Sequence, residues 1–158
     1  MNVHFLSQSE KKRLLAELET HYNIKNLPYL LLETGRKKIR AFSGSLTKEE
    51  IFELSRSINI ELIGLYIINK KDDIPRISFD SLPLFKAQIS KNIINLEESQ
   101  LQLWLRGHDL DIEAPKGVVI LKFEDDLVGI GKSNSQKIFN YVPKERKLKT
   151  PMPAQQAA

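Results

Sequence analysis

A run of residues near the start of the chain begins polar and then becomes apolar at helical intervals. Ser7 and Glu10 have the spacing of a capping box, in which each side chain accepts a hydrogen bond from the backbone of the other residue. Leu14 and Leu18 then recur about one helical turn apart. The pattern predicts a helix over residues 8–21 that packs through its leucine stripe.

A second capping box stands at Thr47 and Glu50, directly before another apolar repeat. It predicts a second helix with one apolar face, because positions three and four residues apart share one side of a helix. The apolar face comprises Ile51, Phe52, Leu54 and Ile58.

Two hairpins are expected around these helices. Residues 29–32 and 38–42 flank a Thr-Gly turn, and the second strand of this pair is basic. Residues 61–68 are apolar and rich in β-branched side chains, and a polar turn connects them to residues 74–79. Pro75 has no N–H for a strand ladder, so it is expected at a strand start or a sheet edge.

The second part of the chain has one helical pattern followed only by strand patterns. Residues 97–106 start acidic and end basic, in agreement with the helix dipole, and a glycine follows. Residues 117–123, 127–132 and 138–143 have the composition of strands. This succession is typical of a small β-barrel.

Residues 81–96 mix apolar side chains with a proline and asparagines, which is typical of a seam between two domains. We therefore expect an α+β protein with an α/β domain over residues 1–95 and a small β-barrel over residues 96–149. Residues 150–158, rich in proline and glutamine, are expected to form a tail.

Composition narrows the function. The chain has 158 residues, of which 41% are hydrophobic and 28% charged, as in folded globular proteins. It has no cysteine, which excludes disulfides, thiolate metal sites and a thiol nucleophile within these residues. The three histidines are dispersed, without metal-ligand spacing. Because no apolar run reaches membrane-spanning length and the start lacks a signal-peptide pattern, we expect a cytoplasmic, non-enzymatic protein without metal or cofactor.

Positive charge is concentrated at the C-terminal end, where Glu145 is the sole acidic residue after position 131. A second concentration lies at residues 36–40. Such segregation favours a polyanionic partner, although a solvated charged surface explains it equally well without further motifs. The basic residues of the C-terminal end are Lys132, Lys137, Lys144, Arg146, Lys147 and Lys149.

Four short motifs in the second half occur together in one known module. They are Leu-Trp-Leu-Arg-Gly at 103–107, Gly-Val-Val-Ile at 117–120, Val-Gly-Ile-Gly-Lys at 128–132, and the stretch from Asn to Arg at 140–146. In order and spacing they resemble the PUA-like tail of RsmF-type ribosomal RNA cytosine methyltransferases. The resemblance implies a PUA-type RNA-binding domain without the methyltransferase's catalytic domain.

The first half is similar, more loosely, to the pre-PUA domain of Nip-type ribosome-assembly factors. The likeness rests on the strand at residues 62–65 and the hairpin strand at 77–82. Together the two resemblances imply non-catalytic binding of structured ribosomal RNA, as a ribosomal component or an assembly factor. The expected partners are ribosomal RNA or a subunit, with ribosomal proteins or an RNA-modifying enzyme as further partners, but neither DNA nor a membrane. The alternative function is an adaptor that recruits a separate methyltransferase or pseudouridine synthase to ribosomal or transfer RNA.

The candidate RNA-binding residues combine these arguments, since cations neutralise phosphates and aromatic or amide groups recognise bases. Those in the second half are Arg106, His108, Lys132, Lys137, Asn140, Tyr141, Lys144, Arg146, Lys147 and Lys149. Those in the first half are Arg36, Lys37, Lys38 and Arg40, which suggest a second phosphate contact or, alternatively, an edge strand charged against aggregation.

Several of these residues have a structural alternative. Asn140 and Tyr141 suit base recognition, yet Tyr141 alternates with apolar neighbours as a core residue would. His108 follows a helix end and either binds phosphate or caps the turn. Glycines before Lys132 mark a bend or a close backbone approach, such as that of RNA. Trp104 is expected in the core, and the carboxylates of residues 124–126 in a solvated turn.

Overall fold

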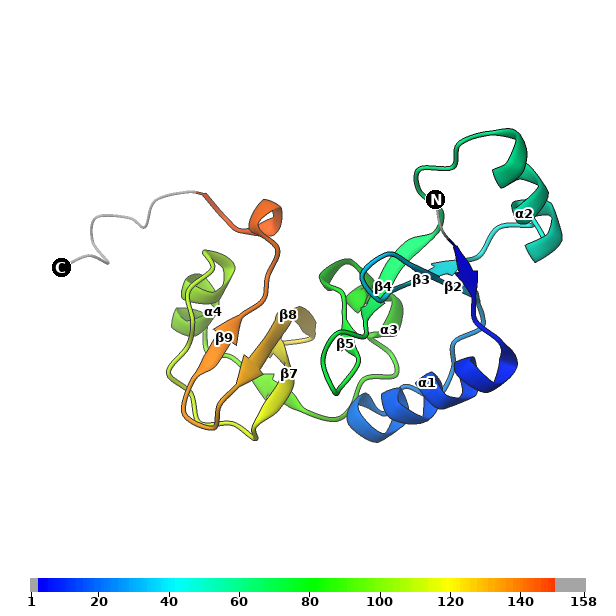
Figure 1. The fold of residues 1–158 in the computed structure, drawn as a ribbon. Coiled ribbons are helices and arrows are strands. Elements are labelled where there is room, and N and C mark those ends of the chain that lie inside the picture. Colours follow the sequence, from blue (N-terminus) through cyan, green and yellow to red (C-terminus); the bar gives the residue numbers. More distant parts are fainter. Residues whose placement is uncertain (1–2, 150–158) are drawn as a thin grey trace. The chain divides into compact units, whose positions relative to one another are not determined.

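The computed structural model describes residues 3–149, and the chain folds as two compact units, Met1–Lys91 and Asn92–Ala158 (Figure 1). The α+β class is confirmed, because each unit combines a sheet with helices. The predicted tail, residues 150–158, lies outside the described residues. The units divide after Lys91 rather than after residue 95, because the intervening strand pairs within the second unit.

The first unit is built on an antiparallel sheet in the order β1-β2-β3-β4-β5. The predicted hairpin around the Thr-Gly turn is confirmed as β2 and β3. The strands are β1 (His4–Phe5), β2 (Leu30–Thr34), β3 (Lys38–Phe42), β4 (Leu65–Asn69) and β5 (Arg76–Ile77). Pro75 directly precedes β5, the last strand of the order, as its missing N–H predicted.

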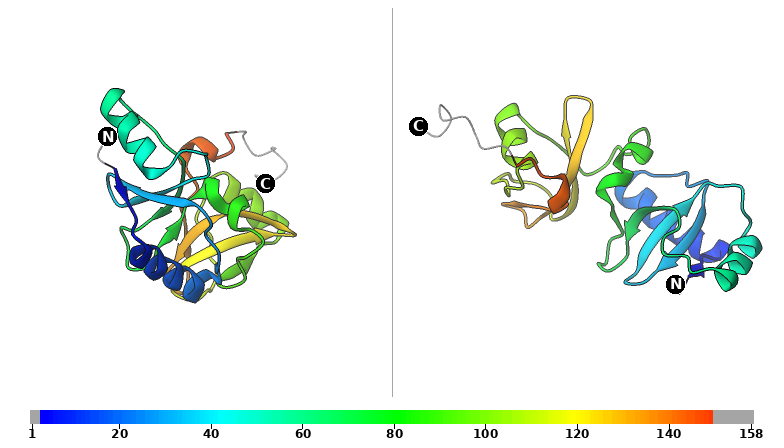
Figure 2. Two further views of the ribbon diagram at one scale, coloured as in Figure 1. Left: turned by 90° about the vertical axis from the view of Figure 1, so that its right-hand side faces the viewer. Right: turned by 90° about the horizontal axis from the view of Figure 1, so that it is seen from above.

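Helix α1 (Gln8–Tyr22) lies along the sheet (Figures 1 and 2). Both predicted capping boxes are present. The leucine stripe of α1 is buried, as predicted. Tyr22 is also fully buried and donates its hydroxyl to the Pro75 carbonyl at 2.7 Å. Burial raises the pKa of the Tyr22 phenol, so this group stays a hydrogen-bond donor at any physiological pH.

Two predictions for the first unit are corrected. The strand expected from residue 61 begins only at Leu65, because Gly64 has a φ of +70° and its carbonyl accepts a hydrogen bond from Arg40. The apolar face of helix α2 (Lys48–Ser57) buries only Ile51. The side chain of Phe52 on the same helix is 58% exposed. The periodicity therefore predicted the helix correctly, but most of its apolar face is not covered by the rest of the unit.

The predicted seam contains local structure of its own. A 3₁₀ turn, Phe79–Ser81, takes the place of the end of the predicted strand and continues into the short helix α3 (Leu82–Phe85). The Ser81 hydroxyl donates to the Ile67 carbonyl at 3.0 Å, which fixes this turn against β4. The seam therefore belongs mostly to the first unit.

The second unit has a four-stranded sheet in the order β6-β7-β8-β9. Strand β6 pairs in parallel with β7, and helix α4 connects them. The described residues form no pairing from β9 back to β6, so the region expected to be a small barrel is an open four-stranded sheet with α4. The elements are β6 (Ile93–Asn95), α4 (Glu98–Leu105), β7 (Gly117–Phe123), β8 (Asp126–Ser133), β9 (Ile138–Asn140) and the 3₁₀ turn η2 (Lys144–Arg146).

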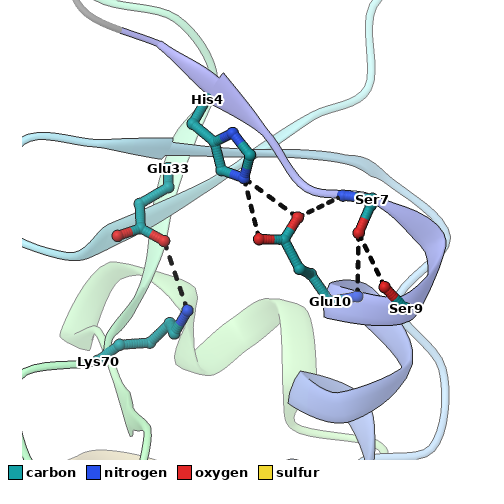
Figure 3. A network of polar contacts seen from close by, with 6 residues as sticks. All are labelled: His4, Ser7, Ser9, Glu10, Glu33 and Lys70. Atoms are coloured by element: carbon teal, nitrogen blue, oxygen red, sulfur yellow. Dashed lines mark hydrogen bonds and ion pairs between the residues drawn. The ribbon is translucent and has the colours of Figure 1, made fainter.

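The start of α1 carries a pH-sensitive contact (Figure 3). The Glu10 carboxylate accepts hydrogen bonds from the Ser7 N–H at 2.7 Å and from His4 Nε2 at 3.0 Å. These contacts, the backbone bond first, lower the pKa of Glu10 to about 2. A carboxyl whose pKa is depressed on folding stabilises the fold above its usual pKa, and this contribution is lost as the pH falls toward the folded value.

Glu10→Gln is therefore expected to reduce the loss of stability that the protein undergoes at acidic pH. Glutamine still accepts the Ser7 N–H bond of a capping box but does not titrate. Between pH 5 and pH 2.5 the melting temperature of the wild type should fall further than that of the variant, as measured by circular dichroism. Equal losses in both proteins would show that this carboxylate does not link folding to protons.

Candidate functional site

Strand β9 and its continuation separate their side chains cleanly into an inner and an outer face. Ile138 and Val142 point inward and are buried. Phe139 and Tyr141 lie on the opposite face and remain 39% and 38% exposed. The ladder continues through Tyr141, whose N–H bonds to the Ile130 carbonyl of β8 at 3.1 Å. Both aromatic rings are therefore held on one outward face of regular sheet.

Lys132 of β8 lies directly across from Phe139 in the antiparallel register, and its side chain is exposed. Side chains of directly opposed residues share a face of the sheet, with Cβ atoms about 4.5–5.5 Å apart. We call Lys132, Phe139 and Tyr141 the β8–β9 surface. It combines one cation with two aromatic rings.

Asn140, predicted as a base reader, is engaged inside the unit. Its side-chain amide donates to the carbonyls of Trp104 at 2.8 Å and His108 at 3.1 Å. Its side-chain oxygen accepts the N–H of Val142 at 2.9 Å. The side chain therefore fastens β9 to the end of α4, and it has little hydrogen-bonding capacity left for a base.

The glycines before Lys132 make room for core side chains and, at Gly131, for the backbone of β9, because a Cβ there would lie 2.8 Å from the Phe139 carbonyl oxygen. A Cβ on Gly129, which has a φ of +153°, would lie 2.5 Å from Trp104 Nε1. A Cβ on Gly131 would meet the Ile138 side chain at 2.5 Å. The small residues make room for the Trp104 ring, which is fully buried as predicted and donates from Nε1 to the Val128 carbonyl at 3.0 Å.

Basic side chains gather around η2, directly after β9. Lys144, Arg146 and Lys149 are exposed, and Lys147 is half-buried. The aliphatic part of Lys147 covers Gly107, where an added Cβ would come within 2.6 Å of its Cδ. The segment is held by the bond from Leu148 N–H to the Leu105 carbonyl at 2.8 Å. We call the four cations the η2 cluster, and their position is fixed on the end of α4.

The other candidates of the second unit are more constrained. Arg106 Nη1 donates to the carbonyl and side-chain oxygen of Gln102 at 2.8 and 2.9 Å. Lys137 lies 3.7 Å from a carboxylate oxygen of Asp111. The backbone N–H of His108 bonds to the Leu103 carbonyl and so takes part in ending α4, while its side chain is exposed. Each of these three residues therefore has a contact within the unit, and none belongs to the β8–β9 surface.

The four basic residues of the first unit divide into two pairs. Arg36 and Lys37 are exposed at the tip of the β2–β3 turn, with φ values of +63° and +57°. Lys38 instead lies over the Tyr66 ring, with Nζ 5.1 Å from its centroid, and Arg40 Nη1 donates to the Gly64 carbonyl at 2.8 Å. Only the turn pair is therefore presented at the tip.

A shallow hollow next to this turn is lined by His4, Glu33, Thr34, Gly35, Arg36 and Lys37. Glu33 on its wall is paired with Lys70 at 3.4 Å (Figure 3). Because Lys70 pairs with the Glu33 carboxylate, the positive charge of the hollow comes mainly from Arg36 and Lys37 of the turn.

Among residues 3–149 no three histidine, aspartate or glutamate side chains come together as metal ligands. The carboxylates of residues 124–126 are exposed at the β7–β8 turn and the first residue of β8, and Glu124 in the turn has a φ of +50°. In the same described range, no helix combines the length and apolar character needed to cross a bilayer.

Sequence reasoning missed Phe139. The strand around it was predicted, and alternation with the buried Ile138 was the available signal. The signal was ambiguous because residues on both faces of this strand are large, so the apolar pattern did not say which face was outside.

Residues 91–148 match the family model described as the methyltransferase RsmF PUA domain. The match covers the sheet of the second unit, α4 and three of the four cations of the η2 cluster, and it confirms the resemblance seen in the four motifs. A search of curated proteins found no match to the chain. The likeness of the first unit to Nip-type pre-PUA domains stays a prediction.

Proposed function

This chain is a PUA-domain protein, and on that premise we propose that it binds structured ribosomal RNA without catalysis, as a ribosomal component or an assembly factor. The observation that carries the proposal is the η2 cluster, three of whose four cations lie within the matched residues 91–148. Cations held at fixed positions on a folded surface bind the phosphate chain of an RNA by releasing its counterions. PUA domains in general suggest an RNA partner, and the ribosomal assignment is the finer part of the proposal.

The turn pair of the first unit supports a second phosphate contact. Arg36 and Lys37 adopt left-handed backbone angles, which cost non-glycine residues free energy. Their cationic side chains extend from the tip of a hairpin, where they are available to a polyanion. Two linked contacts raise overall affinity beyond that of either one, because the second binding event is intramolecular.

A non-catalytic role agrees with the side chains available. The 158 residues include no cysteine, so they lack the catalytic thiol of the methyltransferases whose tail they resemble. The polar side chains that sequence reasoning singled out, such as Asn140 and Arg106, donate to backbone carbonyls within the fold. These hydrogen bonds hold the end of α4 and strand β9 in place and supply no catalytic group.

An adaptor for a separately encoded RNA-modifying enzyme is the second candidate, and the apolar surface of the first unit favours it. Phe52 is 58% exposed and Leu62 is 67% exposed. Ile58, between them in sequence, is exposed as well. Large exposed apolar side chains that gather on one part of a protein are typical of protein-binding sites.

Sedimentation of a lysate through a sucrose gradient, with and without nuclease, tests both candidates. We expect the protein to migrate with ribosomal subunits or their precursors and to return to the top of the gradient after nuclease treatment. Migration at the top in both gradients would contradict the ribosomal proposal. Fast migration that resists nuclease, with a methyltransferase or pseudouridine synthase in the same fraction, would favour the adaptor.

A further inference from the structure

The β8–β9 surface has more than the charge that phosphate binding needs. Phe139 and Tyr141 are large aromatic side chains that leave over a third of their surface exposed on a regular sheet. Of the other two aromatic side chains in this unit, Trp104 is fully buried and Phe123 is half-buried. Exposed rings in this position present π-faces or edges to whatever approaches the strand.

The spacing of the two rings suits nucleotides. Residues two apart on a strand lie about 6.5–7 Å apart on the same face. This is roughly twice the thickness of an aromatic ring, so each side chain has room to stack with a separate base. Lys132, directly opposite Phe139, places a cation beside the first ring, at the distance of a cross-strand neighbour.

The rings also stand on a firm support. On one side, β9 pairs with β8 through Gly131, Lys132 and Ser133. On the other side, a bridge joins Ile138 to Leu110, and the Asn140 N–H donates to the Asp109 carboxylate at 2.8 Å. Because β9 is fixed from both edges, binding to its outer face costs little ordering of the backbone.

From this arrangement we infer that the β8–β9 surface binds unpaired nucleotides of an RNA, with bases stacked on Phe139 and Tyr141 and a phosphate beside Lys132. The inference rests on the proposed RNA-binding function and names the class of RNA. In a duplex the bases stack on each other and expose only their edges, so the two rings have partners only in loops, bulges or single strands. The β8–β9 surface therefore selects for RNA that presents unpaired bases.

The test compares a short single-stranded RNA with an RNA duplex of equal length by fluorescence anisotropy. Phe139→Leu with Tyr141→Leu keeps apolar side chains but removes both rings. Loss of a stacking ring lowers affinity about fivefold at the low end of the known range, so the double variant should bind the single strand about thirtyfold or more weakly. Its affinity for the duplex should change by no more than about twofold.

A matched variant exchanges the two residues, Phe139→Tyr with Tyr141→Phe, and so retains both rings. It should bind the single strand like the wild type. The emission of Trp104, the one tryptophan of the chain, reports whether the second unit of each variant is folded. A readout independent of affinity is photocrosslinking of RNA that contains 5-iodouridine, because the photoproduct forms with a stacked aromatic ring. Trypsin should then recover the RNA on the peptide from Ile138 to Lys144.

The outcomes separate this inference from the proposed function. If the wild type binds neither RNA, both fail. If it binds the duplex with salt-dependent affinity and the leucine variant binds both RNAs as the wild type does, RNA binding stands and the base-stacking site is excluded. Equal losses on both RNAs, or crosslinks on other peptides, also exclude it. If the leucine variant loses only a nuclease-resistant protein complex, the surface is a protein contact and the inference is wrong.

Discussion

Trp104→Ala is expected to destabilise the second unit by about 3–5 kcal/mol, the usual cost of removing a large buried aromatic side chain. The ring is fully buried and lies over Gly129 and Gly131, where no side chain can take its place. Its loss also leaves the Val128 carbonyl without the hydrogen bond from Nε1. Hydrogen exchange of the amides in β7 and β8 measures the loss in this unit alone.

Leu103→Ala provides the matched control, because Leu103 lies next to Trp104 on α4 and is exposed. In the Leu103→Ala variant the free energy of opening, measured from hydrogen exchange in β7 and β8, should change by less than about 1 kcal/mol. A Trp104→Ala variant that keeps wild-type protection in β8 would contradict the role given to the ring. Trp104→Phe should fall between the two, because it restores part of the buried area but not the N–H donor.

The helices and hairpins could be predicted from the sequence because their signals are local. Both capping boxes join residues three apart, and the side chain of Ser7 bonds to the Glu10 N–H as the spacing requires. The β2–β3 hairpin likewise depends on a turn of a few residues. In these segments the competing conformations are decided within one turn of chain, so the pattern suffices.

The roles of the candidate site residues could not be predicted, because their partners are distant in sequence. Asn140 has the composition of a base reader, but its amide bonds to the Trp104 carbonyl, 36 positions earlier. Gly129 has the composition of a bend, yet it is small because the Trp104 ring occupies the space above it. Residue 104 thus contacts both, Asn140 through its backbone carbonyl and Gly129 through its ring, and nothing near residues 129–140 identifies it as their common neighbour.

The same limit applies to surfaces. The periodicity around Phe52 predicted an apolar helix face, but only tertiary packing decides that Ile51 is covered while Phe52 is exposed. On β9, alternation alone does not say which of two apolar faces is outside. Ile138 is buried beside Gly131, where the Trp104 ring also lies, and this leaves Phe139 and Tyr141 outside. An aromatic residue in a strand therefore needs the fold before its function can be inferred.

Neutralising three cations of the η2 cluster is expected to weaken RNA binding on the order of a hundredfold at 0.1 M salt, because each phosphate left without a cation reduces the salt slope by about 0.7–0.9. The variant carries Lys144→Gln, Arg146→Gln and Lys147→Met, and the methionine keeps an unbranched apolar chain over Gly107. Filter binding between 50 and 300 mM salt should give a slope flatter by about 2–3 units.

A control variant has the same change of net charge in exposed residues of the first unit outside the turn pair. It carries Lys12→Gln, Lys25→Gln and Lys48→Gln. Its slope should stay near that of the wild type. If the two variants flatten the slope equally, the effect is one of total charge, and the η2 cluster is not the phosphate-binding site.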